Sequence, residues 1–264
     1  LDKIDSIIYG FEFINNLKIL NLQFNALRFA SYFYLIESNI ENLSMTKLSH
    51  CRSFYIRNNK NLKNISKTNF WQESDRFEIE NCDAIENLDF INDSFIVKDR
   101  IYIANNDSLS TCDVPFICNN ISNTDFIFIR NNGENCKNEI DIGKLCGYTS
   151  TCPNSSFLLH SDYDVNLWNE NYSECEELKG GLSFKNNFSL KPNFQKLKKV
   201  NYDISISNTN LKSVDFPTLQ QLSLISITDN NLLESVFFPS LDSIEAIHIS
   251  DNNILRQINL TSNI

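Results

Sequence analysis

Carboxylates are the side chains of this 264-residue chain whose spacing could support acid–base chemistry. Four of them follow one another along a short stretch, at Glu78, Glu80, Asp83 and Glu86. Two carboxyl groups on one strand face could serve as the acid and the base, or the nucleophile, of a glycoside hydrolase. Equivalent positions in neighbouring segments carry arginine, lysine or serine instead. We therefore expect a solvated strand face at this stretch and not a catalytic pair.

Other catalytic and metal-binding motifs are missing from the sequence. The histidines, His50, His160 and His248, form no H-E-x-x-H motif and do not lie near a G-x-S-x-G turn. The chain has only six glycines and no glycine-rich loop that could cradle a phosphate. Its cysteines are not spaced as the paired C-x-x-C elements of a compact zinc site. We predict a protein that is not an enzyme and that holds no metal ion or cofactor.

The composition restricts the partner and the compartment. A net charge of −10 and a pI near 4.8 argue against nucleic acid and anionic lipid as partners. No apolar stretch approaches the roughly 18–20 residues of a membrane helix, so we expect no direct membrane insertion in this segment. Eight cysteines beside a single methionine indicate an oxidising compartment. We predict an extracellular or cell-surface protein whose ligand is a protein or a carbohydrate.

An internal repeat of 22 residues organises the positions of these side chains. Residues 214–229 (VDFPTLQQLSLISITD) align with residues 236–251 (VFFPSLDSIEAIHISD), so that Pro217 falls on Pro239. Each repeat contains an alternating apolar strand, a polar corner and an apolar anchor, with a second anchor three residues later. The anchors recur every 21 to 24 residues, at Ile19, Ile40, Leu62, Ile85 and Leu109, and every 21 or 22 residues at Leu190, Leu211, Leu233 and Leu255.

Short apolar strands precede the corners. Their alternating β-branched and aromatic residues are typical of half-buried strands and lie at residues 11–13, 54–56, 77–79, 101–103, 204–206, 225–227 and 247–249. One rung of about 22 residues cannot bury its apolar face alone, but rungs stacked at about 4.8 Å share a continuous core. The repeat therefore predicts a mainly β solenoid of parallel strands.

Asparagines mark many of the corners, at Asn58, Asn81, Asn105, Asn186 and Asn208. Asparagine tolerates a left-handed backbone and can bond to neighbouring backbone groups. Stacked corners would align these amides in a ladder. Asp229 and Asp251 fall in the same position and raise the alternative of a cation site, but a structural ladder is the simpler interpretation.

The repeat is interrupted between Cys112 and Gly181, where six of the eight cysteines lie. Residues 126–129 (FIFI) still match a strand, whereas residues 115–120 and 138–145 are typical of short helices. Ser161 resembles a helix N-cap before residues 165–168. Because solenoids need caps over their open rungs, the interruption indicates a closing cap followed by an opening cap.

The cap sequences resemble a known family. The segment between Cys112 and Cys146 resembles the cysteine-bearing end of receptor L-domains, which are leucine-rich-repeat-like modules. The resemblance lies in the stretches CDVPFICNNIS, FIFIRNNGENC and IDIGKLC. The stretch that follows Cys152 resembles the start of the next module, and it reads LLHSDYDVNLWNENYSECEELKGGLSF. This version is similar to repeat modules of large surface proteins of Bacteroidota, including flavobacteria. The resemblance implies right-handed parallel β-helix-like solenoids whose open sheet face, in animal receptors, binds protein ligands.

Two such modules are expected. Residues 1–146 would form a first L-domain-like solenoid without its N-terminal cap, closed by the cysteine-rich cap. Residues 147–264 would supply the opening cap and rungs of a second solenoid whose C-terminal end is missing. The chain starts at Leu1 without a visible signal peptide, so we expect a piece of a longer precursor.

The resemblance also implies disulfide bonds. It pairs Cys152 with Cys175 across the opening cap and places two bonds within the closing cap. Those two bonds would join Cys112, Cys118, Cys136 and Cys146, for which three connectivities are open. Cys51 and Cys82 lie among the repeats and are expected to be free thiols that fill core space.

Ligand and modification sites are less well specified. Phe70 and Trp71, in a longer connection, could anchor a partner or pack on the solenoid wall. A lysine cluster at residues 185–199 is interpreted as a solvated edge in preference to an anion site. In a eukaryotic source, nine sequons would be glycosylation candidates, at Asn42, Asn64, Asn92, Asn106, Asn120, Asn154, Asn171, Asn187 and Asn259.

These features favour an extracellular recognition or adhesion module that binds a macromolecular ligand without catalysis. The ectodomain of a eukaryotic signalling receptor is the main alternative. A β-helix enzyme that cleaves polysaccharides is a more distant one, since parallel β-helices include such enzymes.

Overall fold

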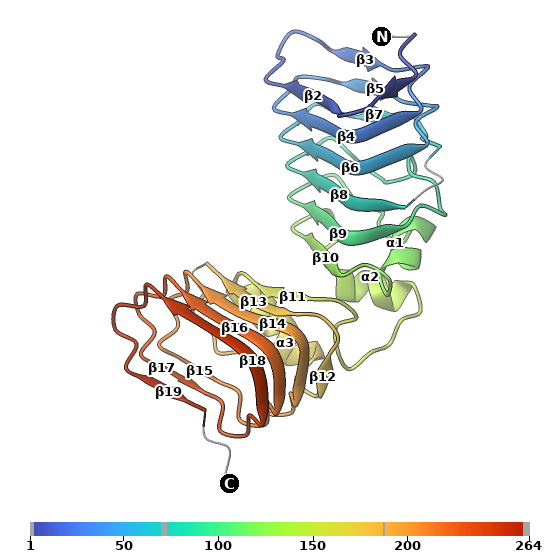
Figure 1. Ribbon diagram of the computed structural model, residues 1–264. Coiled ribbons are helices and arrows are strands. Elements are labelled where there is room, and N and C mark those ends of the chain that lie inside the picture. Colours follow the sequence, from blue (N-terminus) through green and yellow to red (C-terminus); the bar gives the residue numbers. More distant parts are fainter. Residues whose placement is uncertain (1–2, 70–72, 187, 261–264) are drawn as a thin grey trace. The chain divides into compact units, whose positions relative to one another are not determined.

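The computed structural model describes residues 3–69, 73–186 and 188–260. The chain divides into two compact units, residues 1–149 and 150–264, and each unit is a stack of parallel strands (Figure 1). The division falls close to the predicted boundary after residue 146. The predicted mainly β solenoid with short helices is confirmed.

The first unit has a broad sheet and a narrow sheet, both parallel. The broad sheet has seven strands, ordered β1-β4-β6-β8-β9-β10 with β2 also paired to β4. The strands are β1 (Ser6–Ile7), β2 (Phe11–Ile14), β4 (Phe29–Ile36), β6 (His50–Arg57), β8 (Ser74–Glu80), β9 (Val97–Ala104) and β10 (Phe126–Arg130). The narrow sheet contains β3 (Asn21–Gln23), β5 (Asn42–Ser44) and β7 (Asn64–Ile65).

The second unit repeats this arrangement. Its broad sheet has six strands, ordered β11-β13-β14-β16-β18 with β12 paired to β14. They are β11 (Phe157–Leu159), β12 (Glu177–Leu178), β13 (Leu182–Lys185), β14 (Lys199–Ser207), β16 (Gln221–Thr228) and β18 (Ser243–Ser250). The narrow sheet contains β15 (Ser213–Asp215), β17 (Ser235–Phe237) and β19 (Gln257–Asn259). All the predicted strand triplets lie in the broad sheets of the two units.

Stacking in register turns each inward position into a column through the core. Phe11, Phe33, Phe54 and Phe77 are successive register partners, and their ring centroids lie 5.2, 5.4 and 5.6 Å apart. The neighbouring inward position carries Leu, Ile and Ile on β4, β6 and β8. A single rung exposes one edge of such a side chain, and the next rung covers it. The core therefore exists only as a stack.

The predicted corner asparagines adopt the left-handed backbone. Their φ angles lie between 53° and 62°, and Asp229 and Asp251 have the same conformation. The Nδ2 group of Asn81 donates to Oδ1 of Asn58 across 2.7 Å, so an amide ladder runs from corner to corner there. Asn186 departs from this pattern because its amide contacts the ring of His160.

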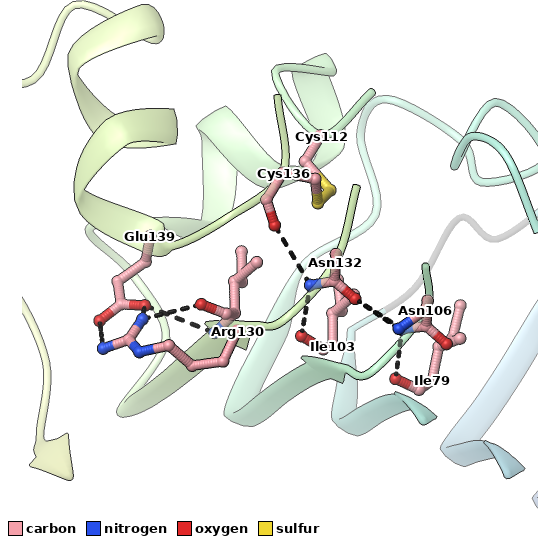
Figure 2. The surroundings of a disulfide bond; sticks show 9 residues. Ile79, Ile103, Asn106, Cys112, Arg130, Asn132, Cys136 and Glu139 are labelled. Atoms are coloured by element: carbon pink, nitrogen blue, oxygen red, sulfur yellow. Dashed lines mark hydrogen bonds and ion pairs between the residues drawn. A yellow bond between two sulfur atoms is a disulfide. The ribbon is translucent and has the colours of Figure 1, made fainter. Parts of the chain in front are cut away.

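A second column, just after the corners, lies inside the wall. It consists of Ser38, Asn59, Cys82, Asn106 and Asn132 in the first unit, and of Thr209, Asn230 and Asn252 in the second. Figure 2 shows part of it: Nδ2 of Asn106 donates to Oδ1 of Asn132 (2.9 Å) and to the carbonyl of Ile79 (3.2 Å). The backbone N–H of Asn106 also donates to Oδ1 of Asn132 (3.1 Å). Each asparagine of this column thus bonds to backbone groups of the preceding rung.

Six of the nine predicted anchors are buried, Leu255 is half-buried, and two are exposed. Ile40, Leu62, Ile85, Leu109, Leu211 and Leu233 belong to the core. Leu190 is 40% exposed, so its assignment as a core anchor was wrong. Phe188 and Phe194 occupy the core at this rung, and the Asp162 carboxylate accepts from the Leu190 N–H (2.8 Å) at the surface. Ile19, on the first rung, is also exposed.

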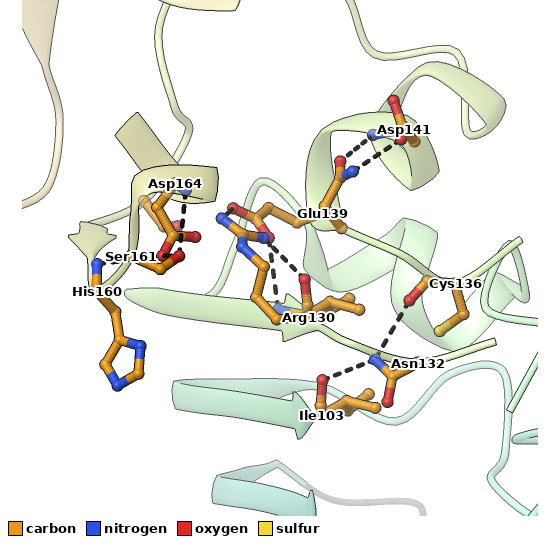
Figure 3. Close-up of polar contacts among 12 residues, drawn as sticks. Ile103, Arg130, Asn132, Cys136, Glu139, Asp141, His160, Ser161 and Asp164 are labelled. Atoms are coloured by element: carbon orange, nitrogen blue, oxygen red, sulfur yellow. Dashed lines mark hydrogen bonds and ion pairs between the residues drawn. The ribbon is translucent and has the colours of Figure 1, made fainter. Parts of the chain in front are cut away.

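Three helices occupy the interruption of the repeat: α1 (Pro115–Asn120), α2 (Glu139–Leu145) and α3 (Asp162–Asn171). Asn138 caps α2 by accepting from the Asp141 N–H (2.8 Å), and Ser161 caps α3 by accepting from the Asp164 N–H (3.4 Å) (Figure 3). The predicted helices and the Ser161 cap are therefore confirmed.

Three disulfide bonds close these caps. Cys112 pairs with Cys136, Cys118 with Cys146, and Cys152 with Cys175. The last pair is the one implied by the family resemblance, and the first two select one of the three open connectivities. Cys51 and Cys82 are free and buried, as expected.

The two free thiols should be unreactive in the folded protein. Burial raises the pKa of Cys51 and of Cys82 to about 12, so the nucleophilic thiolate is scarce near neutral pH. We expect a thiol reagent to label no cysteine of the oxidised native chain and two cysteines in denaturant. Mass spectrometry of the labelled chain checks this count. More than two labelled thiols before reduction would contradict the disulfide assignment.

Candidate functional site

The outer face of the first unit's broad sheet concentrates large and charged side chains. Because side chains alternate along a strand, the residues between the core positions of β4 to β10 point outward. Register aligns them in three adjacent columns. We define the aromatic–arginine face by Tyr32, Tyr34, Tyr55, Arg57, Arg76, Glu78, Arg100, Tyr102 and Phe126.

Aromatic rings on this face contact one another and the arginines. The rings of Tyr34 and Tyr55 meet edge to face with centroids 4.5 Å apart, and Tyr102 stacks on Phe128 at 4.9 Å. The Arg100 guanidinium lies 4.9 Å from the Phe126 ring centroid. Such contacts restrain long side chains that would otherwise be flexible.

Glu78 lies at the centre of this face and is buried. Its side chain is only 2% exposed, which makes the expected solvated position wrong for this residue. It contacts the Arg57 guanidinium directly, and Nη1 of Arg100 lies 3.8 Å from Oε1. Alternation does place Glu78 on the outer side of β8. Its register partners, Tyr55 and Tyr102, flank it on the neighbouring strands and exclude water.

Charge and burial set the protonation of the groups around Glu78. Burial disfavours the charged form of Arg57, but the hydrogen bond and charge of Glu78 outweigh it and raise the pKa of the guanidinium. Burial, followed by the charge of Glu80, raises the pKa of Tyr102 to about 12. The Tyr102 hydroxyl therefore stays protonated and keeps its hydrogen-bond donor.

The corresponding face of the second unit is different in character. Its outward column on β13, β14, β16 and β18 consists of Ser183, Ser205, Ser226 and His248. The parallel column continues with Ser207, Thr228 and Ser250. Four of the seven arginines of the chain lie on β6, β8 and β9, whereas the only arginine of the second unit is Arg256. Two copies of one fold thus carry unlike surfaces.

Of the other sequence candidates for acid–base chemistry, Glu80 shares Arg57 with Glu78, whereas Asp83 and Glu86 lie elsewhere. Glu80 lies 3.7 Å from Arg57, and Asp83 lies 3.9 Å from Lys60 beyond the corner. Glu86 borders a separate hollow of about 190 Å³ that Lys63, Asn64 and Phe90 also line. This volume is below the roughly 300 Å³ at which small-molecule sites begin.

The histidines lie on separate elements. His50, in β6, stacks on Phe29 of β4 with ring centroids 4.8 Å apart. His160 precedes α3, and His248 is exposed on β18. Among the described residues, no group of three or more His, Cys, Asp or Glu side chains could hold a metal ion.

Some of the predicted ligand and modification sites lie outside the described residues, and part of the lysine cluster is ion-paired. Phe70, Trp71 and the sequon residue Asn187 lie outside the described residues. In the lysine cluster, Lys198 contacts Glu176 (2.9 Å) and Lys199 contacts Glu177 (3.3 Å), so at least part of it is ion-paired.

Two of the nine sequon asparagines cannot be surface glycosylation sites in the folded protein. Asn106 and Asn120 are fully buried, and their amides bond to core backbone groups. Asn120 Nδ2 donates to the carbonyl of Phe95 across 2.8 Å, and its Oδ1 accepts from the Val97 N–H across 2.7 Å. A glycan on either amide would displace the wall of the solenoid.

The buried Arg130–Glu139 pair beside the closing cap has a structural role. The Arg130 guanidinium bonds to both carboxylate oxygens of Glu139, one of them at 2.8 Å, and to the carbonyl of Ile129 (Figures 2 and 3). Arg130 is 3% exposed. The pair fastens α2 to the last strand of the sheet, and the sequence alone offered no signal for it.

Comparisons with protein-family models, with curated proteins and with solved structures find no match for the chain. Within the part of the chain that the structure describes, no helix is long and apolar enough to cross a membrane. The function has to be inferred from the arrangement of the residues themselves.

Replacing Glu78 tests whether its carboxylate holds the aromatic–arginine face together. Glu78→Gln leaves Arg57 beside a neutral amide, and we expect the free energy of unfolding to fall by about 2 kcal/mol. Glu80→Gln is the matched control and should cost less than about 1 kcal/mol, because that ion pair is longer and more exposed. Urea denaturation of the full chain measures both. Equal costs would contradict a central role for Glu78.

Proposed function

We propose that this chain is an extracellular recognition or adhesion module of the receptor L-domain type, which binds a macromolecular ligand without catalysing a reaction. The aromatic–arginine face of the first unit is the proposed contact surface. The observation that carries the proposal is the concentration of tyrosine and arginine there, around a buried carboxylate, on a sheet whose counterpart in the second unit carries small hydroxyl side chains.

Residue types support this choice. Tyrosine and arginine are enriched among the residues that dominate binding energy at protein interfaces. On this face they are restrained by ring stacking and by ion pairs, so little side-chain freedom remains to be lost on binding. The strands beneath are held by backbone ladders on both sides. A broad surface of fixed side chains suits recognition of another macromolecule.

The geometry around Glu78 also disfavours the polysaccharide-cleaving alternative. A general acid or nucleophile must reach the substrate, whereas the Glu78 side chain is buried and engaged by two arginines. The three disulfide bonds are typical of proteins that fold outside the cytosol, which agrees with an extracellular location.

Binding of the full chain to arrays of extracellular proteins and glycans tests the proposal. We expect at least one reproducible ligand, and about tenfold or greater weakening by the double substitution Tyr34→Ala and Tyr102→Ala, which removes two aromatic surfaces from the face. Surface plasmon resonance with the purified ligand measures the change.

Tyr202→Ala provides the matched control. Tyr202 is 59% exposed on β14 of the second unit and lies outside the proposed surface. This variant should bind as the unmodified chain does, and circular dichroism establishes that all variants are folded. Undiminished binding by the folded double variant, or no binding on either array, would contradict the proposal.

A further inference from the structure

Two arginines of the aromatic–arginine face lie directly side by side. Arg76 on β8 and Arg100 on β9 are register partners. Among the paired strand positions of the described residues, this is the only pair of like charges. Like charges directly opposite one another destabilise a sheet. Folding therefore keeps a repulsive pair on this surface.

The contacts of the two guanidinium groups leave donors unused. Arg76 bonds to the Tyr55 hydroxyl and is otherwise exposed. Arg100 lies over the Phe126 ring, 3.8 Å from a Glu78 oxygen, with 45% of its side chain exposed. A guanidinium carries five N–H donors. Two such groups, framed by Tyr55 and Phe126, form a donor-rich patch with aromatic walls.

Two of the carboxylates near this patch make their direct contacts with other arginines. Glu78 makes its direct contact with Arg57 and is shared with Arg100 only at the longer distance. Asp75 pairs with Arg52. Asp99 acts on Arg76 through its charge and not through a direct contact. An additional carboxylate from outside would therefore relieve repulsion and satisfy free donors together.

We propose that the Arg76–Arg100 pair receives the carboxylate of an aspartate or glutamate side chain from a protein ligand, with an apolar neighbour of that residue packed between Tyr55 and Phe126. This inference rests on the proposed function and specifies the chemistry of its ligand. Guanidinium and carboxylate match in a planar, two-bond geometry, which gives direction as well as affinity.

A protein side chain fits the patch better than an acidic polysaccharide does. A polysaccharide would place further negative charges along the sheet, where Glu80, Asp75 and Asp99 lie on the same strands as the arginines. The chain as a whole carries a net charge of −10, which repels an extended polyanion. A single carboxylate beside apolar groups meets the positive patch and the aromatic rings without this repulsion.

Selection from a displayed library of random disulfide-cyclised peptides on the full chain tests the inference. We expect selected peptides to share an acidic residue next to an apolar or aromatic one. Arg76→Ala and Arg100→Ala should each weaken a synthetic peptide about 30-fold, measured by fluorescence polarisation. Replacing the acidic residue of the peptide by its amide should cost as much, and the two changes combined should not add.

Matched variants separate contact from folding. Arg52→Ala removes an exposed arginine of the same sheet that is already paired with Asp75, and it should leave peptide affinity within about twofold. Arg76→Lys keeps the charge but loses the planar fork, so its affinity should be intermediate. Non-additivity with the peptide amide is a readout that a merely misfolded variant would not produce.

Each other outcome has a definite meaning. Peptides that depend on Tyr34 and Tyr102 but not on the arginines would overturn this inference and leave the proposed function standing. Peptides indifferent to all four residues, or no selected peptide, would overturn both. Arginine-dependent binding of heparin oligosaccharides or oligogalacturonates, without such peptides, would overturn the protein ligand in favour of an acidic polysaccharide.

Discussion

Hydrogen bonds from one rung to the side chain of the next, inside the solenoid wall, are the constraint on which the rest of the structure depends. The Ser38 and Cys82 N–H groups donate to the buried amides of Asn59 and Asn106. In the second unit, the Thr209 N–H donates to Asn230. Because side chains alternate with a period of two, a slip of one residue would exchange the inner and outer faces. These buried bonds hold the register at each corner and hence decide which residues reach the surface.

The aromatic–arginine face depends on that register at every point. Glu78 is buried because Tyr55 and Tyr102 occupy the same position on the adjoining strands, and the Arg76–Arg100 pair exists because two rungs align them. The second unit keeps the same parallel scaffold with Ser205 and Ser226 outward. The scaffold therefore tolerates very different outer faces, and we assign the proposed binding to the outward side chains and not to the fold.

The sequence was sufficient to predict the repeating strands and corners. It was insufficient to predict how side chains on adjacent rungs bury one another. Period-two triplets and corner asparagines such as Asn58 report local preferences, so strands and left-handed corners could be located. The burial of Glu78 arises from Tyr55 and Tyr102, which are 23 and 24 positions away in the sequence, and alternation alone predicts a solvent-facing side chain. Likewise, the buried role of Asn59 was not predicted, because the preceding Asn58 already accounted for the asparagine at that corner. Leu190 matches the anchor spacing, but Phe188 and Phe194 occupy the core at its rung.

The central role of the buried column is tested most directly by comparing Asn59→Ala with Asn61→Ala in urea denaturation of the full chain. Asn59 accepts from the Ser38 N–H (3.1 Å) and donates to the carbonyls of Leu35 (2.8 Å) and Arg57 (2.6 Å). Its loss leaves buried backbone groups unpaired and should lower the free energy of unfolding by about 3 kcal/mol. Asn61, on the same rung, makes an exposed contact with Asn39, and its replacement should cost no more than about 0.5 kcal/mol. Similar small costs for both variants would contradict the account.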